Sequence, residues 1–153
     1  IMGDYTMKII KINTNLELTT HEFPEGSIQE QNDALRDLIG DGCGIYERVM
    51  PRRLYTDLHM EAHTTMIPGQ CVSMLVDGEG LFKDSISPNP VGCYLYGTDK
   101  HGCPIVGDIL FVGEKWADDG INFCGIAGDV FEVLEAQLKD MAQKMKQAKG
   151  AIG

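Results

Sequence analysis

The amino-acid sequence predicts an α+β fold, in which a small, mostly antiparallel sheet is covered by two longer helices and one short helix. Short segments rich in β-branched and apolar residues recur between turns, which indicates several strands. Two longer segments place apolar residues at the spacing of three and four residues that is typical of amphipathic helices. The chain has no internal repeat and no low-complexity segment, so residues 1–153 are expected to form a single domain.

The N-terminal part is expected to form two adjoining strands followed by a helix. The segment 7–13 is rich in β-forming residues, and 16–23 alternates apolar and polar side chains, as a strand with one buried face does. Ser27 and Glu30 have the spacing of a capping box, which predicts a helix start, and Gly40 supplies a C-terminal stop. The apolar stripe of this helix consists of Ile28, Leu35, Leu38 and Ile39.

The middle of the chain alternates predicted strands with less regular segments. Residues 44–50 are expected to form a strand that ends at Pro51, and 71–76 to form a buried strand that stops at the turn DGEG. Between them, the segment 51–70 shows no clear periodicity. It is expected to be a long loop, an irregular strand or an insertion.

The C-terminal half begins with a helix signal. Asn89 is expected to be an N-cap with Pro90 at the first helical position, which predicts a short helix through the following VGCYLYG. Residues 103–113 are expected to form an apolar strand, and 116–129 a glycine-rich connection. A long amphipathic helix is then expected from Asp129. Its apolar stripe consists of Phe131, Leu134, Leu138, Met141 and Met145.

The charge balance limits the kinds of partner that we expect. The formal net charge is −10, whereas a protein that binds duplex nucleic acid needs a basic face, so no duplex nucleic acid is expected as a partner. No apolar run approaches the roughly 18 residues of a membrane span, so no membrane partner is expected. The N-terminal segment lacks the basic and apolar regions of a signal peptide, which favours a cytoplasmic location.

Cysteine and histidine provide two candidate chemistries. The five cysteines are dispersed and odd in number, which argues against a disulfide framework and favours free, mostly buried thiols. His59 and His63 could share a helix face, but the zincin pattern and a third ligand are missing, so no metal and no cofactor are expected. A Cys/His enzyme would use Cys93 or Cys103 with His101, although Pro104 removes a backbone donor beside Cys103.

Basic and aromatic side chains gather around the predicted strand 44–50 and the residues that follow it. Guanidinium groups beside aromatic rings suit an anionic ligand that contains a base, and a strand would point Tyr46 and Arg48 to the same face. Plain surface exposure explains the same pattern, so both interpretations stay open. The pocket would also include the 97–104 loop. The expected ligand-binding residues are Tyr46, Arg48, Arg52, Arg53 and His101.

The chain also resembles a family. The relevant motifs are SIQEQNDALRDLIGDGCGIYE, VSMLVDGEGLFKDSISPNPVGCYLYG and PIVGDILFVGE, in this order and before a final helix. This arrangement is similar to the small bacteriophage and mobile-element proteins grouped as domain-of-unknown-function family 3846. The resemblance covers about residues 8–145, and the chain is longer than expected at 55–70. It implies an accessory protein of phage or mobile-element origin and carries over no activity.

Three functional hypotheses follow. The first is a non-enzymatic accessory binding protein that counters host defence by sequestering an anionic, nucleotide-like ligand, with a pocket at an oligomer interface. The second is an acidic protein–protein inhibitor of a host protein. The third is the small Cys/His enzyme. The expected partners are therefore a small anionic ligand or a host protein, together with further copies of the chain, in the cytoplasm of the host cell.

Overall fold

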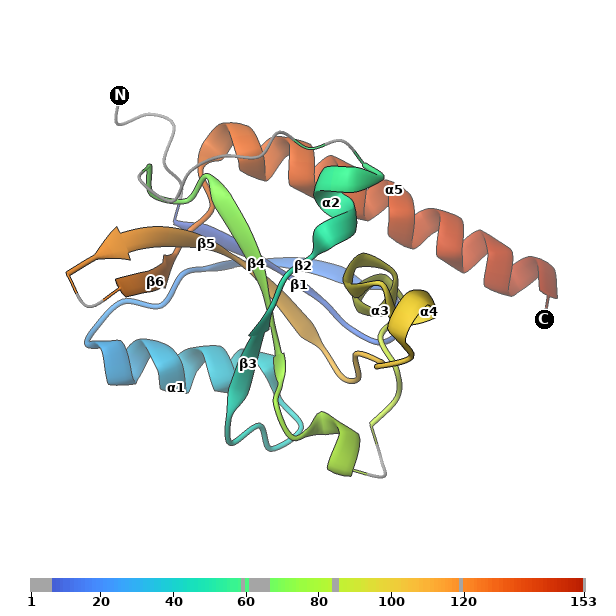
Figure 1. The fold of residues 1–153 in the computed structure, drawn as a ribbon, viewed down its shortest axis with the longest axis horizontal. Coiled ribbons are helices and arrows are strands. Elements are labelled where there is room, and N and C mark those ends of the chain that lie inside the picture. Colours follow the sequence, from blue (N-terminus) through green and yellow to red (C-terminus); the bar gives the residue numbers. More distant parts are fainter. Residues whose placement is uncertain (1–6, 59, 61–66, 84–85, 119, 153) are drawn as a thin grey trace.

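The computed structural model describes residues 7–58, 60, 67–83, 86–118 and 120–152. It confirms the predicted α+β fold, with a sheet in the order β2-β1-β5-β4-β3 and β6 paired to β5 (Figure 1). Each of these strand pairs is antiparallel. The strands are β1 (Lys8–Ile12), β2 (Leu18–Glu22), β3 (Tyr46–Val49), β4 (Cys71–Asp77), β5 (Ile109–Ala117) and β6 (Gly120–Cys124).

The helices lie on both sides of the sheet. In Figure 1, α5 runs above the strands and α1 below them, while α2, α3 and α4 lie beside β3 and β4. Among the described residues, no helix has the length and apolar character that crossing a bilayer requires. The helices are α1 (Ile28–Ile39), α2 (Arg52–Thr56), α3 (Pro90–Tyr96), α4 (Thr98–His101) and α5 (Gly128–Ile152), with a 3₁₀ turn η2 (Gly80–Phe82).

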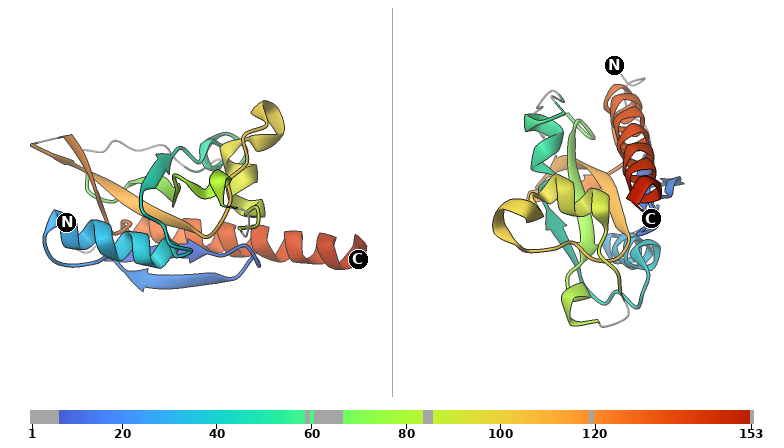
Figure 2. Two further views of the ribbon diagram at one scale, coloured as in Figure 1. Left: turned by 90° about the horizontal axis from the view of Figure 1, so that it is seen from below. Right: turned by 90° about the vertical axis from the view of Figure 1, so that its right-hand side faces the viewer.

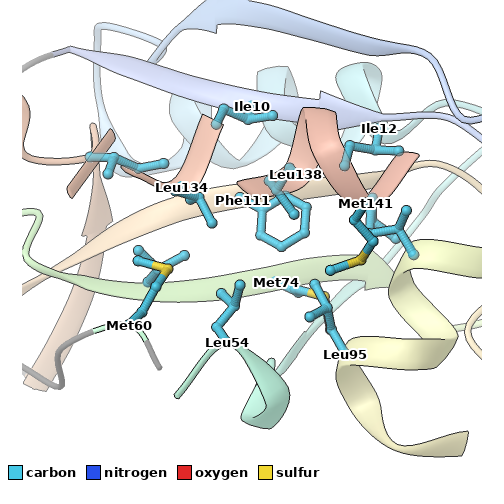
Figure 3. Packing of buried hydrophobic residues seen from close by; sticks show 14 of the residues in the cluster. Ile10, Ile12, Leu54, Met60, Met74, Leu95, Phe111, Leu134, Leu138 and Met141 are labelled. Atoms are coloured by element: carbon cyan, nitrogen blue, oxygen red, sulfur yellow. The ribbon is translucent and has the colours of Figure 1, made fainter. Parts of the chain in front are cut away.

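Strand alternation divides the core into two layers. On β5, Phe111 points to one face and Leu110 to the other, because successive side chains of a strand face opposite ways. The Phe111 face packs against α2, α3 and α5, and Figure 3 shows Leu54, Leu95 and Leu134 converging there. The opposite face packs against the apolar stripe of α1. Each face of the sheet therefore has its own helical cover.

The predicted helix signals are confirmed where caps or stripes define them. Ser27 and Glu30 form a complete capping box at the start of α1. The predicted stripe of α5 faces the core, since Leu134 and Leu138 are fully buried and Phe131 nearly so. The left-hand view of Figure 2 shows that the C-terminal part of α5 extends beyond the rest of the molecule.

Asn89 anchors the short helix α3 to two separate parts of the sheet. The residue is fully buried, and its side-chain oxygen accepts a hydrogen bond from the backbone N–H of Gly92 as the N-cap. Its amide nitrogen donates to the backbone oxygen of Ile12 at 3.1 Å and to that of Gly107 at 3.0 Å. One side chain thus makes hydrogen bonds with the start of α3, with the end of β1 and with the segment that leads into β5.

Two predicted boundaries are wrong. The strand predicted at 103–113 begins only at Ile109, because Gly107 adopts a positive φ of 82° and the preceding residues bind the start of α3. The connection predicted at 116–129 contains β6, which forms a hairpin with the end of β5. A glycine-rich composition concealed this strand, whose first residue Gly120 pairs with Ala117 and adopts a positive φ of 118°.

The segment predicted as a loop at 51–70 also contains regular structure. Arg52–Thr56 form the short helix α2, which starts directly after Pro51. Its apolar anchor is Leu54, which is fully buried against the Phe111 face of the sheet. Five residues are too few for helical periodicity to show in the sequence, so tertiary packing of Leu54 determines this element.

The buried amide of Asn89 leads to a stability prediction. Asn89→Ala removes the N-cap, which is worth about 1 kcal/mol, and it removes the amide donor to two backbone oxygens in a buried environment, at about 1–3 kcal/mol each. We expect a loss of about 3 kcal/mol or more in the free energy of unfolding, measured by urea denaturation. Ser27→Ala is the matched control, because it removes an exposed N-cap only. Equal losses for the two variants would contradict the role given to the amide of Asn89.

Candidate ligand-binding pocket

A hollow of about 410 Å³ lies between α2 and the α3–α4 segment. Pockets of about 300–1,000 Å³ commonly hold small molecules. The hollow lies on the Phe111 side of the sheet, beyond the buried anchors Leu54 and Leu95. It is called the α2–α4 pocket below. Its lining residues are Arg52, Arg53, Thr56, Asp57, Leu95, Tyr96, Gly97, Lys100 and His101.

Local sequence explains how the pocket forms. Pro51 follows β3 and precedes α2, so the chain leaves the sheet edge and places Arg52 and Arg53 at the start of this helix. On the opposite wall, Gly97 ends α3 in the left-handed conformation with a φ of 86° and lets α4 start at once. Glycine adopts this backbone conformation without steric cost. The reversal turns Lys100 and His101 of α4 toward α2.

Arg53 connects the walls of the pocket. Its Nη1 donates to the backbone oxygen of Tyr94 at 3.0 Å, and its two Nη atoms lie 2.7 and 2.9 Å from the carboxylate oxygens of Asp99. Its guanidinium carbon lies 4.6 Å from the centroid of the Tyr94 ring. Its side chain is only 11% exposed. Arg53 therefore supports α2, α3 and α4 and has little hydrogen-bonding capacity left for a ligand.

Two carboxylates neighbour the Arg53 guanidinium. A hydrogen bond from the Arg53 guanidinium holds the pKa of Asp99 below the ordinary value of an aspartate carboxyl group. Hydrogen bonds from the hydroxyl groups of Thr56 and Tyr94 lower the pKa of Asp57. Asp57 also lies 3.4 Å from Nε of Arg53. Both carboxylates are therefore held in their charged forms, and they compensate the charge of Arg53.

Arg52 and Lys100 carry the positive charge that remains available to a ligand. Both side chains are exposed and line the pocket. Within the part of the chain that the structure describes, neither side-chain charge has a hydrogen-bond or ion-pair partner at close range. The lining includes the three cations Arg52, Arg53 and Lys100 against one carboxylate, that of Asp57. The pocket is thus locally positive in a chain with a net charge of −10.

His101 forms part of the wall. Its Nδ1 accepts a hydrogen bond from the backbone N–H of Cys103 at 3.2 Å, which leaves the ring proton on Nε2. Nε2 lies 3.1 Å from the backbone oxygen of Tyr96 and donates to it. The rings of His101 and Tyr96 meet edge to face with their centroids 4.7 Å apart. Backbone groups therefore occupy both imidazole nitrogens.

The thiols proposed for a Cys/His enzyme are placed differently from a catalytic pair. Sγ of Cys93 donates to the backbone oxygen of Ile105 and accepts from its N–H, each at 3.3 Å. Cys103 is exposed and reaches His101 through its backbone N–H. The expectation of mostly buried thiols holds only in part, because Cys124 is buried, Cys103 is exposed and the other three thiols are intermediate.

The five expected site residues do not all converge. Arg52, Arg53 and His101 line the α2–α4 pocket, whereas Tyr46 and Arg48 lie on the α1 face of the sheet. Tyr46 donates to Oδ1 of Asn32 at 2.6 Å. Arg48 lies 2.8 Å from the buried Glu114 carboxylate and donates to Ser73. Alternation along β3 places Tyr46 and Arg48 on the α1 face of the sheet. The chain then turns at Pro51, so that Arg52 and Arg53 of α2 lie on the Phe111 face.

Sequence reasoning included the 97–104 loop in the pocket but did not name Lys100 within it. It missed the aromatic wall formed by Tyr96, which was assigned to the short helix without a stated role. The signal that could have identified them is the Lys100–His101 pair between Gly97 and Gly102, because two glycines with positive φ enclose a single helical turn. Such a turn presents its polar side chains at a fixed position.

The metal hypothesis has no support in the described residues. His59 and His63 lie outside them. Within the described ranges, no group of three or more His, Cys, Asp or Glu side chains could hold a metal ion. The pocket is therefore the candidate site that the described residues define best.

Comparison of the chain with protein-family models, curated proteins and solved structures finds no match. The geometry and charge of the α2–α4 pocket are therefore the features that indicate a function.

The network around Arg53 predicts a difference between two adjacent arginines. We expect Arg53→Ala to lower the melting temperature, because it removes the ion pair, the Tyr94 contact and a hydrogen bond between α2 and α3. Arg53→Lys should not restore it, since an ammonium group cannot reproduce the guanidinium fork. Arg52→Ala is the matched control and should leave the melting temperature unchanged. Equal effects in both alanine variants would contradict the supporting role of Arg53.

The lowered pKa of Asp99 predicts a dependence of stability on pH. A carboxyl group whose pKa is lower in the folded state stabilises the fold above its ordinary value of 3.8, and this contribution is lost as the pH falls through the folded pKa. The difference in unfolding midpoint between wild type and Asp99→Asn should therefore be largest at pH 5 and shrink below about pH 3.8. Urea titrations at several pH values measure it. A difference that stays constant down to about pH 2 would show that Asp99 does not act through its charge.

Proposed function

We propose that this protein is a non-enzymatic binding protein that takes a small, anionic, nucleotide-like molecule into the α2–α4 pocket. The observation that carries the proposal is the pair of exposed cations Arg52 and Lys100 on opposite walls of a hollow of about 410 Å³. An overall charge of −10 repels anions from most of the surface, so a local positive pocket attracts them selectively.

The two walls suit the two ends of such a ligand. The Arg52 guanidinium can bind a phosphate through two parallel hydrogen bonds, and Lys100 adds a point charge from the facing wall. Tyr96, which is half-buried above Leu95, provides aromatic surface for a ring system. The hydroxyl group of Thr56 adds a short-range donor or acceptor. A phosphate joined to a planar base satisfies these groups together.

The engagement of His101 and Cys93 by backbone groups supports binding rather than catalysis by a Cys/His pair. Both nitrogens of His101 are engaged by backbone groups, as is the sulfur atom of Cys93. A general base needs a nitrogen or oxygen atom that is free to accept a proton from the reacting group. For the lining residues, holding a ligand is therefore the simpler role.

The biological setting of the proposal comes from the resemblance to phage and mobile-element proteins. In this setting, the protein acts in the cytoplasm of the host cell and sequesters a nucleotide signal of host defence. Sequestration requires tight binding without turnover, which agrees with a pocket that offers charge but no activated group. The origin and the counter-defence role depend on the resemblance, whereas the anionic ligand class depends on the pocket.

Binding can be tested with purified protein by isothermal titration calorimetry against mononucleotides, cyclic dinucleotides and ADP-ribose. We expect at least one of these anions to bind, and Arg52→Ala and Lys100→Ala each to weaken it by about tenfold or more, since each removes a charge-assisted contact. The matched control is Lys146→Ala, which changes the net charge equally on the exposed side of α5.

Two results would count against the proposal. Binding that Arg52→Ala and Lys100→Ala leave unchanged would place the ligand elsewhere on the molecule. No binding across the panel would remove the nucleotide class and favour the acidic inhibitor of a host protein.

A further inference from the structure

The turn η2 presents unusually exposed apolar side chains. Phe82 is 85% exposed and Leu81 57% exposed, and Ile45, at the adjoining start of β3, is 63% exposed. Ile45 and η2 are linked because the backbone N–H of Gly78 donates to the backbone oxygen of Ile45 at 2.8 Å. Large apolar side chains that are exposed near one another on a folded chain commonly mark an interaction site. Ile45, Leu81 and Phe82 are called the η2 patch below.

The turn that carries this patch is held rigidly. Asp77 is buried at the end of β4, and its carboxylate accepts a hydrogen bond from the backbone N–H of Glu79 at 2.9 Å. The same carboxylate forms an ion pair with Nζ of Lys83 at 2.5 Å, and this ammonium also donates to the backbone oxygen of Asp41 at 3.0 Å. Gly80 packs so closely on Val106 that a Cβ there would lie 2.5 Å from a methyl group.

Rigidity matters because it lowers the entropy cost of docking. A side chain such as Phe82 loses little freedom on binding when its backbone is already fixed. A buried ion pair such as Asp77–Lys83 is a weak source of stability, since desolvation of the charges offsets their attraction. Its clearest effect here is to fix the turn that presents Phe82 and Leu81 to solvent.

Acidic side chains surround the η2 patch. Glu47 and Ile45 both lie beside Gly78, each with an atom 3.6 Å from the position of a Cβ on that glycine. Glu79 is exposed and directly precedes η2. The basic neighbour Lys83 is already paired with Asp77. The patch is therefore an apolar protrusion with a negative rim, which requires an apolar hollow with a positive rim.

The α2–α4 pocket has this complementary chemistry. Tyr96 supplies an aromatic wall above the buried Leu95, and Arg52 and Lys100 supply positive charge at the edge of the pocket. Three other hollows that the described residues line do not match. The one beside Tyr46 measures only about 170 Å³ and has no charged side chain, the one beside Tyr94 contains two carboxylates with Arg53, and the one beside Pro24 contains Glu22 and Asp37.

We infer that the η2 patch of one copy of this chain docks in the α2–α4 pocket of a second copy. Phe82 and Leu81 then contact the half-buried Tyr96, while the carboxylates of Glu47 and Glu79 face Arg52 and Lys100. The same chain cannot fill its own pocket in this arrangement, because its Phe82 is 85% exposed.

The η2 patch and the α2–α4 pocket lie at different places on the same chain. In the right-hand view of Figure 2, α4 projects to the left and η2 lies at the bottom of the molecule. A two-fold arrangement in which each patch enters the pocket of the other copy would give two identical contacts and close the assembly. The contact does not depend on any particular ligand. However, an anionic ligand in the pocket would compete with the incoming turn.

Sedimentation velocity of the purified protein, from about 1 µM to about 1 mM, tests the inference. We expect a monomer–dimer equilibrium that Phe82→Ala weakens by about tenfold or more, because it removes the central aromatic anchor. The matched control is Trp116→Ala, which truncates another exposed aromatic side chain on the β5–β6 hairpin and should leave the equilibrium unchanged. A protein that stays monomeric throughout, or a dimer indifferent to Phe82→Ala, would overturn the inference.

A charge exchange provides a test that loss of folding cannot imitate. Glu79→Lys and Lys100→Glu should each be monomeric alone, since each places like charges across both contacts of the dimer. Mixed in equal amounts, they should form a heterodimer, because one contact then has the native charges and the other has them reversed. Failure of the mixture to associate, with both variants folded by circular dichroism, would refute the pairing of η2 with this pocket.

The result is distinguishable from that of the ligand experiment. A dimer that responds to Phe82→Ala without any nucleotide binding would support this inference and not the proposed ligand. Nucleotide binding by a protein that stays monomeric would do the opposite.

Discussion

The arrangement of this molecule depends on one buried amide. Asn89 caps α3 and at the same time donates to the end of β1 and to the chain entering β5. These hydrogen bonds fix the position of α3 relative to the sheet, and Leu95 then completes the Phe111 face of the core. Tyr96 and Gly97 directly follow Leu95 in the chain. The hydrogen bonds of Asn89 therefore also fix the positions of the aromatic wall of the pocket and of the start of α4. A polar side chain in the core thus determines where the candidate site forms.

The contacts of Arg53 determine how charge is distributed in the pocket. Arg53 is the least exposed cation of the lining, and it is neutralised by Asp57 and Asp99 while it joins three helices. Because Arg53 pairs with both carboxylates, Arg52 and Lys100 form no ion pair within the described residues, although the charge of Lys100 still acts on Asp57 and Asp99. A structural ion-pair network therefore creates a positive site beside it. This explains how a chain with a net charge of −10 can offer an anion-binding surface.

Local signals in the sequence were sufficient for the elements that local interactions determine. The capping box at Ser27, the N-cap at Asn89 and the stripe of α5 all predict structure that is present. The site was predicted only in part, because its assembly depends on tertiary geometry. Tyr46 and Arg48 are close to Arg52 in sequence, yet strand alternation and Pro51 place them on opposite faces of the sheet. Lys100 lies far from Arg52 in sequence and close to it in space, and no periodic pattern connects the two.

Ligand binding and self-association, if both use the α2–α4 pocket, are coupled by thermodynamic linkage. A ligand that occupies the pocket excludes the η2 patch of a second copy, so it binds the monomer and draws the equilibrium away from the dimer. The reverse holds to the same extent, since reciprocity requires that dimer formation weaken ligand binding by the same factor. At high concentration, a sequestering protein with this property would hold its pocket covered by the η2 turn of a second copy. An anion with enough affinity would then release the monomer and expose Phe82, which gives ligand capture a structural consequence at a second surface.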